Sequence, residues 1–86
     1  MTHFATPGFW WHYRQLPPDV QALADKNFDL LRANSRHPSL RLKLVGGAWS
    51  ARVGLGHRAL ARSRTEGLVW FWIGPHDEYE RIIGGG

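Results

Sequence analysis

The first third of the chain places its apolar residues at the spacing of α-helices. In the segment "GFWWHYRQLPPD", positions 8–19, one helix face is expected to carry Phe9, Trp10 and Tyr13. In "PPDVQALADKNFDLLRANS", positions 17–35, a single buried stripe is formed by Val20, Leu23, Ala24, Phe28 and Leu31. The prolines at 17–18 stop the first helix and open the second, since proline is tolerated in a first helical turn. Asn34 is expected to close the second helix as a left-handed cap.

After Pro38 the apolar period changes from near four to two, which is typical of strands. Strands are expected in "LRLKLV" (40–45), "WSARVGL" (49–55), "HRALARSR" (57–64) and "LVWFWI" (68–73). Turns are expected at 46–47, at Gly56 and at 65–67, the last ending in a left-handed glycine. In the second strand, Ser50 and Arg52 are expected on the polar face, opposite Trp49, Ala51, Val53 and Leu55. The fourth strand is apolar on both faces, as a strand covered on both sides would be.

The two ends complete the predicted fold. "THFA" near the N-terminus suits a short edge strand, and "HDEYERII" predicts a terminal helix with Tyr79, Ile82 and Ile83 on one side. The sequence therefore predicts an α+β fold in which an N-terminal helical hairpin packs on a small twisted antiparallel sheet, followed by a short C-terminal helix. Residues 1–86 are expected to form a single domain, with 84–86 as a flexible tail.

Composition narrows the class of protein. The chain has 86 residues, 43% of them hydrophobic, and five tryptophans that can bury large areas in a small core. It has no cysteine, which fits a reducing cytoplasm, and neither a signal peptide nor a membrane span is expected. The five histidines are scattered without ligand-like spacing, so neither a metal nor a cofactor is expected. The net charge of +4 is mostly arginine and favours a polyanionic partner.

Candidate chemistry gathers where the fourth strand ends. That strand delivers Gly74-Pro75-His76-Asp77, and the neighbouring strands are expected to bring Arg52 and Arg58 beside them. Metal-free RNA cleavage needs a base for the 2′-hydroxyl proton, an acid for the 5′-oxygen, and cations for the phosphoryl oxygens. Histidine serves as acid or base near neutral pH, and arginine contacts phosphate bidentately. These residue types therefore suit an RNA-cleaving site, provided that Arg58 and His76 share one solvent-reachable hollow.

Each of these residues also has an ordinary structural role. His76 could cap the terminal helix, Asp77 could be a helix-start charge, and Tyr79 could belong to the core. Arg62 could belong to a solvated face, and Arg58 could be an ion-pair partner of an acidic residue in the terminal helix. The residues alone leave these alternatives open.

The pattern "LPPDVQALADKNFDLLRANSRHPSLRLKLVGGAWSARVGLGHRALA…GLVWFWIGPHDEYERII" resembles the RelE/ParE superfamily of type II toxin–antitoxin toxins. The resemblance covers nearly the whole chain through the "LP" corner, "HPSLRLKL", "WSARVGLGHRAL" and "IGPHDEY". It implies a cytoplasmic toxin neutralised by an antitoxin protein. In RelE-like members the toxin enters the ribosomal A site and cuts mRNA. ParE-like members share the fold but inhibit DNA gyrase and need no nuclease site.

The resemblance assigns roles to individual residues. Arg58 matches the arginine of "GHR", where many relatives have "GYR", and His76 and Tyr79 match the family's positions after the last strand. The catalytic set is expected to be Arg52, Arg58, His76 and Tyr79, and the RNA-binding set to be Arg41, Lys43, Arg62 and Asp77. Ser50 stands where relatives often have a cation, and His57 replaces the usual tyrosine.

Three functions remain as hypotheses at this point. The first is a ribosome-dependent mRNA endonuclease, whose partners are the antitoxin, the ribosome and mRNA. The second is a gyrase inhibitor without nuclease activity, and the third is a catalytically inactive toxin homologue.

Overall fold

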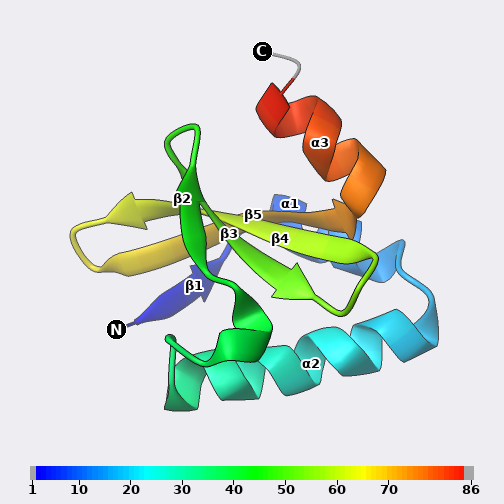
Figure 1. Ribbon diagram of the computed structural model, residues 1–86, viewed down its shortest axis with the longest axis horizontal. Helices are drawn as coiled ribbons and strands as arrows, with labels where there is room; N and C mark the ends of the chain where they lie inside the picture. The colour runs from blue at the N-terminus through cyan, green and yellow to red at the C-terminus, as the bar shows by residue number, and fades with distance from the viewer. Residues whose placement is uncertain (1, 85–86) are drawn as a thin grey trace.

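A computed structural model describes residues 2–84 of the chain and confirms the predicted α+β class (Figure 1). The elements in order are β1 (His3–Ala5), α1 (Pro7–Arg14), α2 (Pro18–Ala33), the 3-10 turn η1 (Pro38–Leu40), β2 (Lys43–Val45), β3 (Ala48–Val53), β4 (His57–Arg64), β5 (Gly67–Pro75) and α3 (His76–Gly84). Two helices thus precede four consecutive strands and a short final helix, as the change of period at Pro38 predicts.

The sheet has five strands in the order β1-β5-β4-β3-β2. Strands β2 to β5 pair antiparallel with their neighbours, whereas β1 pairs parallel with β5 through the partners His3↔Leu68 and Ala5↔Trp70. The predicted edge strand therefore exists, but it makes the sheet mixed where a wholly antiparallel one was expected. Backbone bonds from Leu68 N to Thr2 O and from Thr6 N to Trp70 O continue this pairing beyond β1.

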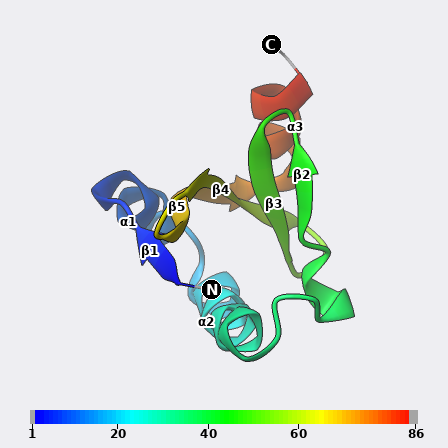
Figure 2. The ribbon, with the colours of Figure 1, turned by 90° about the vertical axis from the view of Figure 1, so that its left-hand side faces the viewer.

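Local sequence explains where the first two helices begin. The Thr6 side chain accepts a hydrogen bond from Phe9 N at 3.1 Å, and Pro7 occupies the first turn of α1. Pro18 plays the same part in α2. Figure 2 shows α1 beside β5 at one edge of the curved sheet and α2 on the side opposite α3. The Tyr13 hydroxyl joins α1 to α2 by donating to Asp25 Oδ1 at 2.8 Å.

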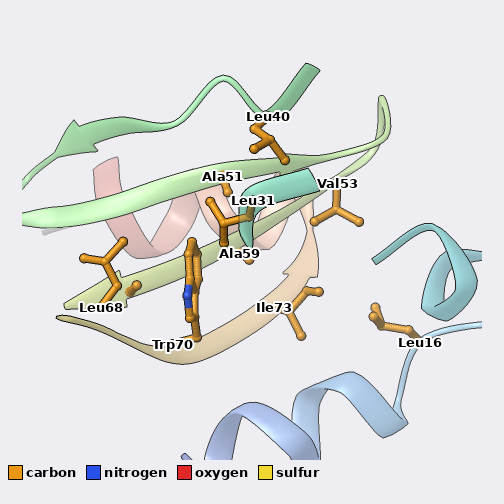
Figure 3. Close-up of a cluster of buried hydrophobic side chains, with 10 residues drawn as sticks. Leu16, Leu31, Leu40, Ala51, Val53, Ala59, Leu68, Trp70 and Ile73 are labelled. Atoms are coloured by element: carbon orange, nitrogen blue, oxygen red, sulfur yellow. The ribbon is translucent and has the colours of Figure 1, made fainter. Parts of the chain in front are cut away.

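The main core fills the space between these helices and the sheet (Figure 3). Its buried side chains are Leu16, Leu31, Leu40, Ala51, Val53, Ala59, Ala61, Leu68, Trp70 and Ile73. On the opposite face of the sheet a second cluster consists of Leu60, Trp72 and Tyr79, with Tyr79 contributed by α3. Strand β5 is therefore covered on both faces over part of its length, which confirms the prediction made from its uninterrupted apolar run.

Strand β5 contains a register irregularity that changes which face its aromatic residues occupy. Ala61 pairs with Trp70 and Leu60 pairs with Trp72, so Phe71 is an extra residue without a partner on β4. As a result, Phe71 packs against the same cluster as Trp72, although a regular strand would place neighbours on opposite faces.

The predicted strand at 40–45 is shorter than expected. Leu40 lies in η1, is 1% exposed, and enters the core from that turn. The turn forms because Pro38 opens it and the His37 ring nitrogen Nδ1 accepts from Ser39 N at 3.2 Å. Its end requires a left-handed residue, and Arg41 takes that conformation with φ 46°. Pairing in β2 can begin only after this reversal.

Other positions also depart from the expected pattern. Asn34 follows α2 in an extended conformation with φ −158°, so it is not the left-handed cap that we expected. Leu55 is 88% exposed because it lies in the turn after β3, and Ile82 is 48% exposed on the outer side of α3. Gly84, expected in a flexible tail, is the last residue of α3, and 85–86 lie outside the described residues.

Candidate functional site

The four residues of the expected catalytic set meet where β4 begins and β5 ends. Arg52 of β3 is the register partner of Arg58 on β4, and Arg58 is the partner of Gly74 on β5. The guanidinium carbon of Arg58 lies 5.3 Å from the centre of the Tyr79 ring. The His76 ring lies 5.5 Å from that same ring, centre to centre. The Tyr79 ring thus lies close to both the Arg58 guanidinium and the His76 imidazole.

Arg58 has unsatisfied hydrogen-bonding groups. Its side chain is half-buried, and within residues 2–84 its Nε and Nη1 atoms are buried without a hydrogen-bond partner. Buried polar groups are usually paired, because an unpaired donor loses its water without compensation. Both atoms are closed to solvent, so a phosphate would reach them only if the Arg58 side chain shifted; the guanidinium fork would then suit bidentate contact with phosphate.

Arg52 adds a second positive charge next to Arg58, which would favour binding of an anion. It lies directly opposite Arg58, and like charges in that relation destabilise a sheet. Its Nε donates to Gly54 O at 3.0 Å, which fixes the side chain near the hairpin turn. On the other side of the sheet, Asn27 of α2 donates to Arg52 O at 3.0 Å and holds this part of β3 in place.

His76 is positioned by the backbone and remains open to solvent. Its N–H donates to Gly56 O at 2.9 Å, which ties the start of α3 to the β3–β4 turn. Its side chain is 43% exposed, and Nδ1 lies 3.6 Å from Glu80 Oε1 one helical turn later. Glu80 therefore contacts His76, and the alternative in which Arg58 pairs with an acidic residue of α3 is not observed among the described ion pairs.

Tyr79 and Asp77 occupy the positions that their ordinary structural roles require. Tyr79 is 3% exposed and packs with Leu60 and Trp72, so it belongs to the core beneath the site while its ring contacts both candidate groups. Asp77 is exposed in the first turn of α3, where a carboxylate is stabilised by the helix dipole.

The expected RNA-binding residues do not all lie together. Arg62 is exposed on β4, and its guanidinium carbon lies 4.8 Å from the centre of the Phe71 ring. Lys43 is exposed on the edge strand β2, and Arg41 is exposed in the link that precedes it. Because β3 separates β2 from β4, Lys43 and Arg41 lie to one side of Arg52, Arg58, His76 and Tyr79, which we call the Arg58 cluster.

Ser50 is in a different environment from the one expected. It is 0% exposed, and its Oγ has no hydrogen-bond partner within residues 2–84, although a polar outward position was expected. Its register partner is Leu60 of the second cluster, which α3 covers. A small side chain therefore occupies this fully buried position opposite Leu60.

Two further residues join the site that sequence reasoning did not single out. Glu80 contacts His76, and its i,i+4 spacing was a readable signal. Phe71 contacts Arg62 only because the irregularity in β5 turns its side chain to the face of the sheet that carries Arg62. The local sequence pattern does not predict this irregularity.

A separate apolar cavity lies on the opposite face, between the N-terminal helices and the sheet. It has a volume of about 300 Å³, and its lining includes Phe9, Phe28 and Trp70. His3 lies at its wall and accepts a hydrogen bond at Nδ1 from Trp70 Nε1 at 3.1 Å. Burial lowers the pKa of His3 below 6.5, with smaller contributions from the N-terminal charge and Arg32. This cavity holds none of the Arg58 cluster except the backbone-anchored Arg52 at its rim.

No helix within residues 2–84 has the length and apolar character needed to span a membrane. No protein-family model and no curated protein sequence matches the chain. Among solved structures, the chain is similar to one chain of the crystal structure of the toxin–antitoxin complex RelBE2 from Mycobacterium tuberculosis. The two are 27% identical with a TM-score of 0.66, over 87% of this chain and 96% of that one. The motif resemblance and this structural likeness agree: the chain resembles the RelE/ParE superfamily and shares the fold of one chain of the RelBE2 toxin–antitoxin complex.

Proposed function

We propose that this chain is the toxin of a type II toxin–antitoxin system and that it cleaves mRNA in the ribosome. The solved structure that it resembles is a toxin–antitoxin complex, which supports the first part of the proposal. The second part rests on one observation. Arg58, with two buried and unpaired guanidinium nitrogens, faces Arg52 and shares the Tyr79 ring with His76.

The arrangement suits attack by a ribose 2′-hydroxyl on the adjacent phosphorus. The 2′-oxygen forms a bond to phosphorus as it loses its proton, and the bond from phosphorus to the 5′-oxygen breaks as that oxygen gains one. The products are a 2′,3′-cyclic phosphate and a 5′-hydroxyl. Arg58 and Arg52 would stabilise the negative charge that develops on the phosphoryl oxygens. His76, exposed beside them, would transfer one of the two protons.

Tyr79 and Glu80 would act through these groups. The buried Tyr79 ring fixes the guanidinium of Arg58 by a cation–π contact, which makes Tyr79 a positioning residue. Glu80 lies close enough to orient the His76 ring. Asp77 is exposed one residue after His76, where it would lie beside bound RNA.

We expect two kinds of partner. An acidic antitoxin segment that is disordered alone would fold on the basic face and neutralise it. The ribosome would present mRNA as an unpaired strand, which fits action in the cytoplasm. With a net charge of only +4, productive contact with RNA would depend on local clusters such as Arg52 and Arg58 more than on overall charge.

Induction of single variants in cells tests the catalytic assignment. Arg58→Gln and His76→Ala are each expected to lower cleavage about a hundredfold or more and to relieve growth arrest, because each removes one group that acts on the transition state. Arg64→Gln, which changes an exposed arginine on the same strand, is the matched control and should remain toxic. Primer extension on cellular transcripts measures cleavage, and thermal unfolding of the purified variants verifies the fold.

The outcomes separate the three functions. Full toxicity of both variants would overturn the catalytic assignment. Growth arrest with intact mRNA and blocked supercoiling would indicate the gyrase-inhibiting alternative. A protein that causes no arrest would be an inactive homologue.

A further inference from the structure

The face of the sheet that carries the Arg58 cluster continues beyond α3. Helix α3 covers Leu60 and Trp72 with Tyr79. Farther along the same face of β4 lies Arg62, whose register partner on β5 is Val69. Helix α3 contacts β4 and β5, and Figure 2 shows it on the side of the sheet opposite α2, yet Arg62 remains exposed. A surface with a basic group is therefore left uncovered beside the helix.

Arg62 and Phe71 form an ordered stack on this uncovered surface. Phe71 is half-buried and packs against the second cluster, so its ring is held in place. The exposed Arg62 guanidinium lies over that ring, with its central carbon 4.8 Å from the ring centre. A planar group that rests one face on an aromatic ring has its second face available for a further planar partner. RNA bases stack on such arginine planes as well as on aromatic side chains.

The distance to the Arg58 cluster suits neighbouring nucleotides of one strand. Arg58 and Arg62 are four residues apart on β4 and face the same side, so their backbones are about 13 Å apart. We propose that Arg62 and Phe71 form a base-stacking subsite for a nucleotide that flanks the scissile phosphate in single-stranded RNA. This inference rests on the proposed function, because the phosphate held by Arg58 defines which nucleotide reaches the stack.

RNA fits this surface better than an acidic peptide does. A carboxylate binds the N–H edge of a guanidinium and makes no use of the flat face that a stacked ring orders. The preformed contact with Phe71 instead fixes a plane, and a plane is the feature that a base requires. Within residues 2–84 no carboxylate forms an ion pair with Arg62, so its charge and its outer face are both available to a ligand.

The test separates the guanidinium plane from its charge. Binding is measured with short single-stranded RNAs whose 2′-hydroxyls are methylated, so that no cleavage occurs, and that carry 2-aminopurine at successive positions. Arg62→Lys is expected to lower the affinity about tenfold and to abolish the fluorescence quenching at one position, with an unchanged salt dependence. Arg62→Gln should also reduce the salt dependence. Arg64→Lys, the same exchange on an exposed arginine of the same strand, should change neither.

Several results would overturn the proposal. If Arg62→Lys binds and quenches like the unmodified protein while Arg58→Gln binds weakly, the stacking subsite is wrong and the proposed nuclease site stands. If the unmodified protein binds none of the RNAs, the stacking subsite fails, whereas the proposed nuclease is decided separately by primer extension in cells. If Arg62→Lys weakens binding of poly-glutamate but not of RNA, the surface serves an acidic polypeptide instead.

Discussion

At the scale of single residues, His3 makes the stability of the fold depend on pH. Its neutral ring accepts the Trp70 indole proton at Nδ1, and burial is the main cause that lowers its pKa below 6.5. A protonated ring could not accept this bond. The folded protein therefore resists a proton that the unfolded chain takes up readily as the pH falls below 6.5. The stabilisation is complete above that pH and is lost as the pH falls through the lowered value.

Chemical denaturation at several pH values measures this effect. The free energy of unfolding is expected to decrease between pH 7 and pH 5, and His3→Asn should flatten that part of the curve. His12→Asn, the same exchange on α1 with the Trp70 bond left intact, is measured alongside it. An unchanged slope in His3→Asn would show that another group governs the pH dependence.

Residue-scale reasoning from sequence reached the Arg58 cluster because strand alternation and turn length fix the register. The short turn before His57 places Arg52 opposite Arg58, and the end of the apolar strand places His76 next to them. The same reasoning failed for Ser50, because a small hydroxyl side chain is compatible with a polar face and with a buried one, and its own pattern does not show which. Roles for the site residues remain predictions.

At the scale of elements, leucines with the same place in the sequence pattern have opposite environments. Leu40 and Leu55 both appear as apolar positions of alternating strands, yet Leu40 is 1% exposed in η1 and Leu55 is 88% exposed in the β3–β4 turn. Leu40→Ala is expected to lower the free energy of unfolding by about 2–5 kcal/mol, because it leaves a cavity in the main core. Leu55→Ala should change it by less than about 0.5 kcal/mol. Urea titrations of both variants measure the difference, and equal costs would contradict the burial of Leu40.

Helices and strands were predictable where the spacing of apolar residues indicates them or where a proline or glycine marks their ends. The prolines of the α1–α2 corner and the glycines after β2 did so. The parallel pairing of β1 was not predictable, because three residues carry no signal for their partner or direction. The irregularity in β5 was hidden for a related reason. In an uninterrupted apolar run, an extra residue such as Phe71 leaves no break in the pattern.

At the scale of the whole molecule, the two faces of the sheet are mechanically one unit. Leu60 faces α3 and its neighbour Ala61 faces the main core, and Trp72 and Ile73 divide in the same way. Because neighbouring residues of β4 and β5 belong to opposite clusters, unfolding of these strands on one face would also disrupt the packing on the other. The site depends on this coupling, because α3 supplies His76 and Tyr79 while β4 supplies Arg58.

We therefore expect a single cooperative unfolding transition in which damage to either cluster is felt by the whole chain. Leu60→Ala and Leu31→Ala, one from each side of the sheet, should each cost about 2–5 kcal/mol. For a domain of this size each kcal/mol lowers Tm by about 4–8 °C. Circular dichroism and tryptophan fluorescence should give the same midpoint in each variant. Two separate midpoints in Leu60→Ala, the first with loss of helix alone, would show that α3 detaches independently. In that case the Arg58 and His76 groups would not be held together by the folded sheet, and the catalytic arrangement would form only when a ligand docks the helix.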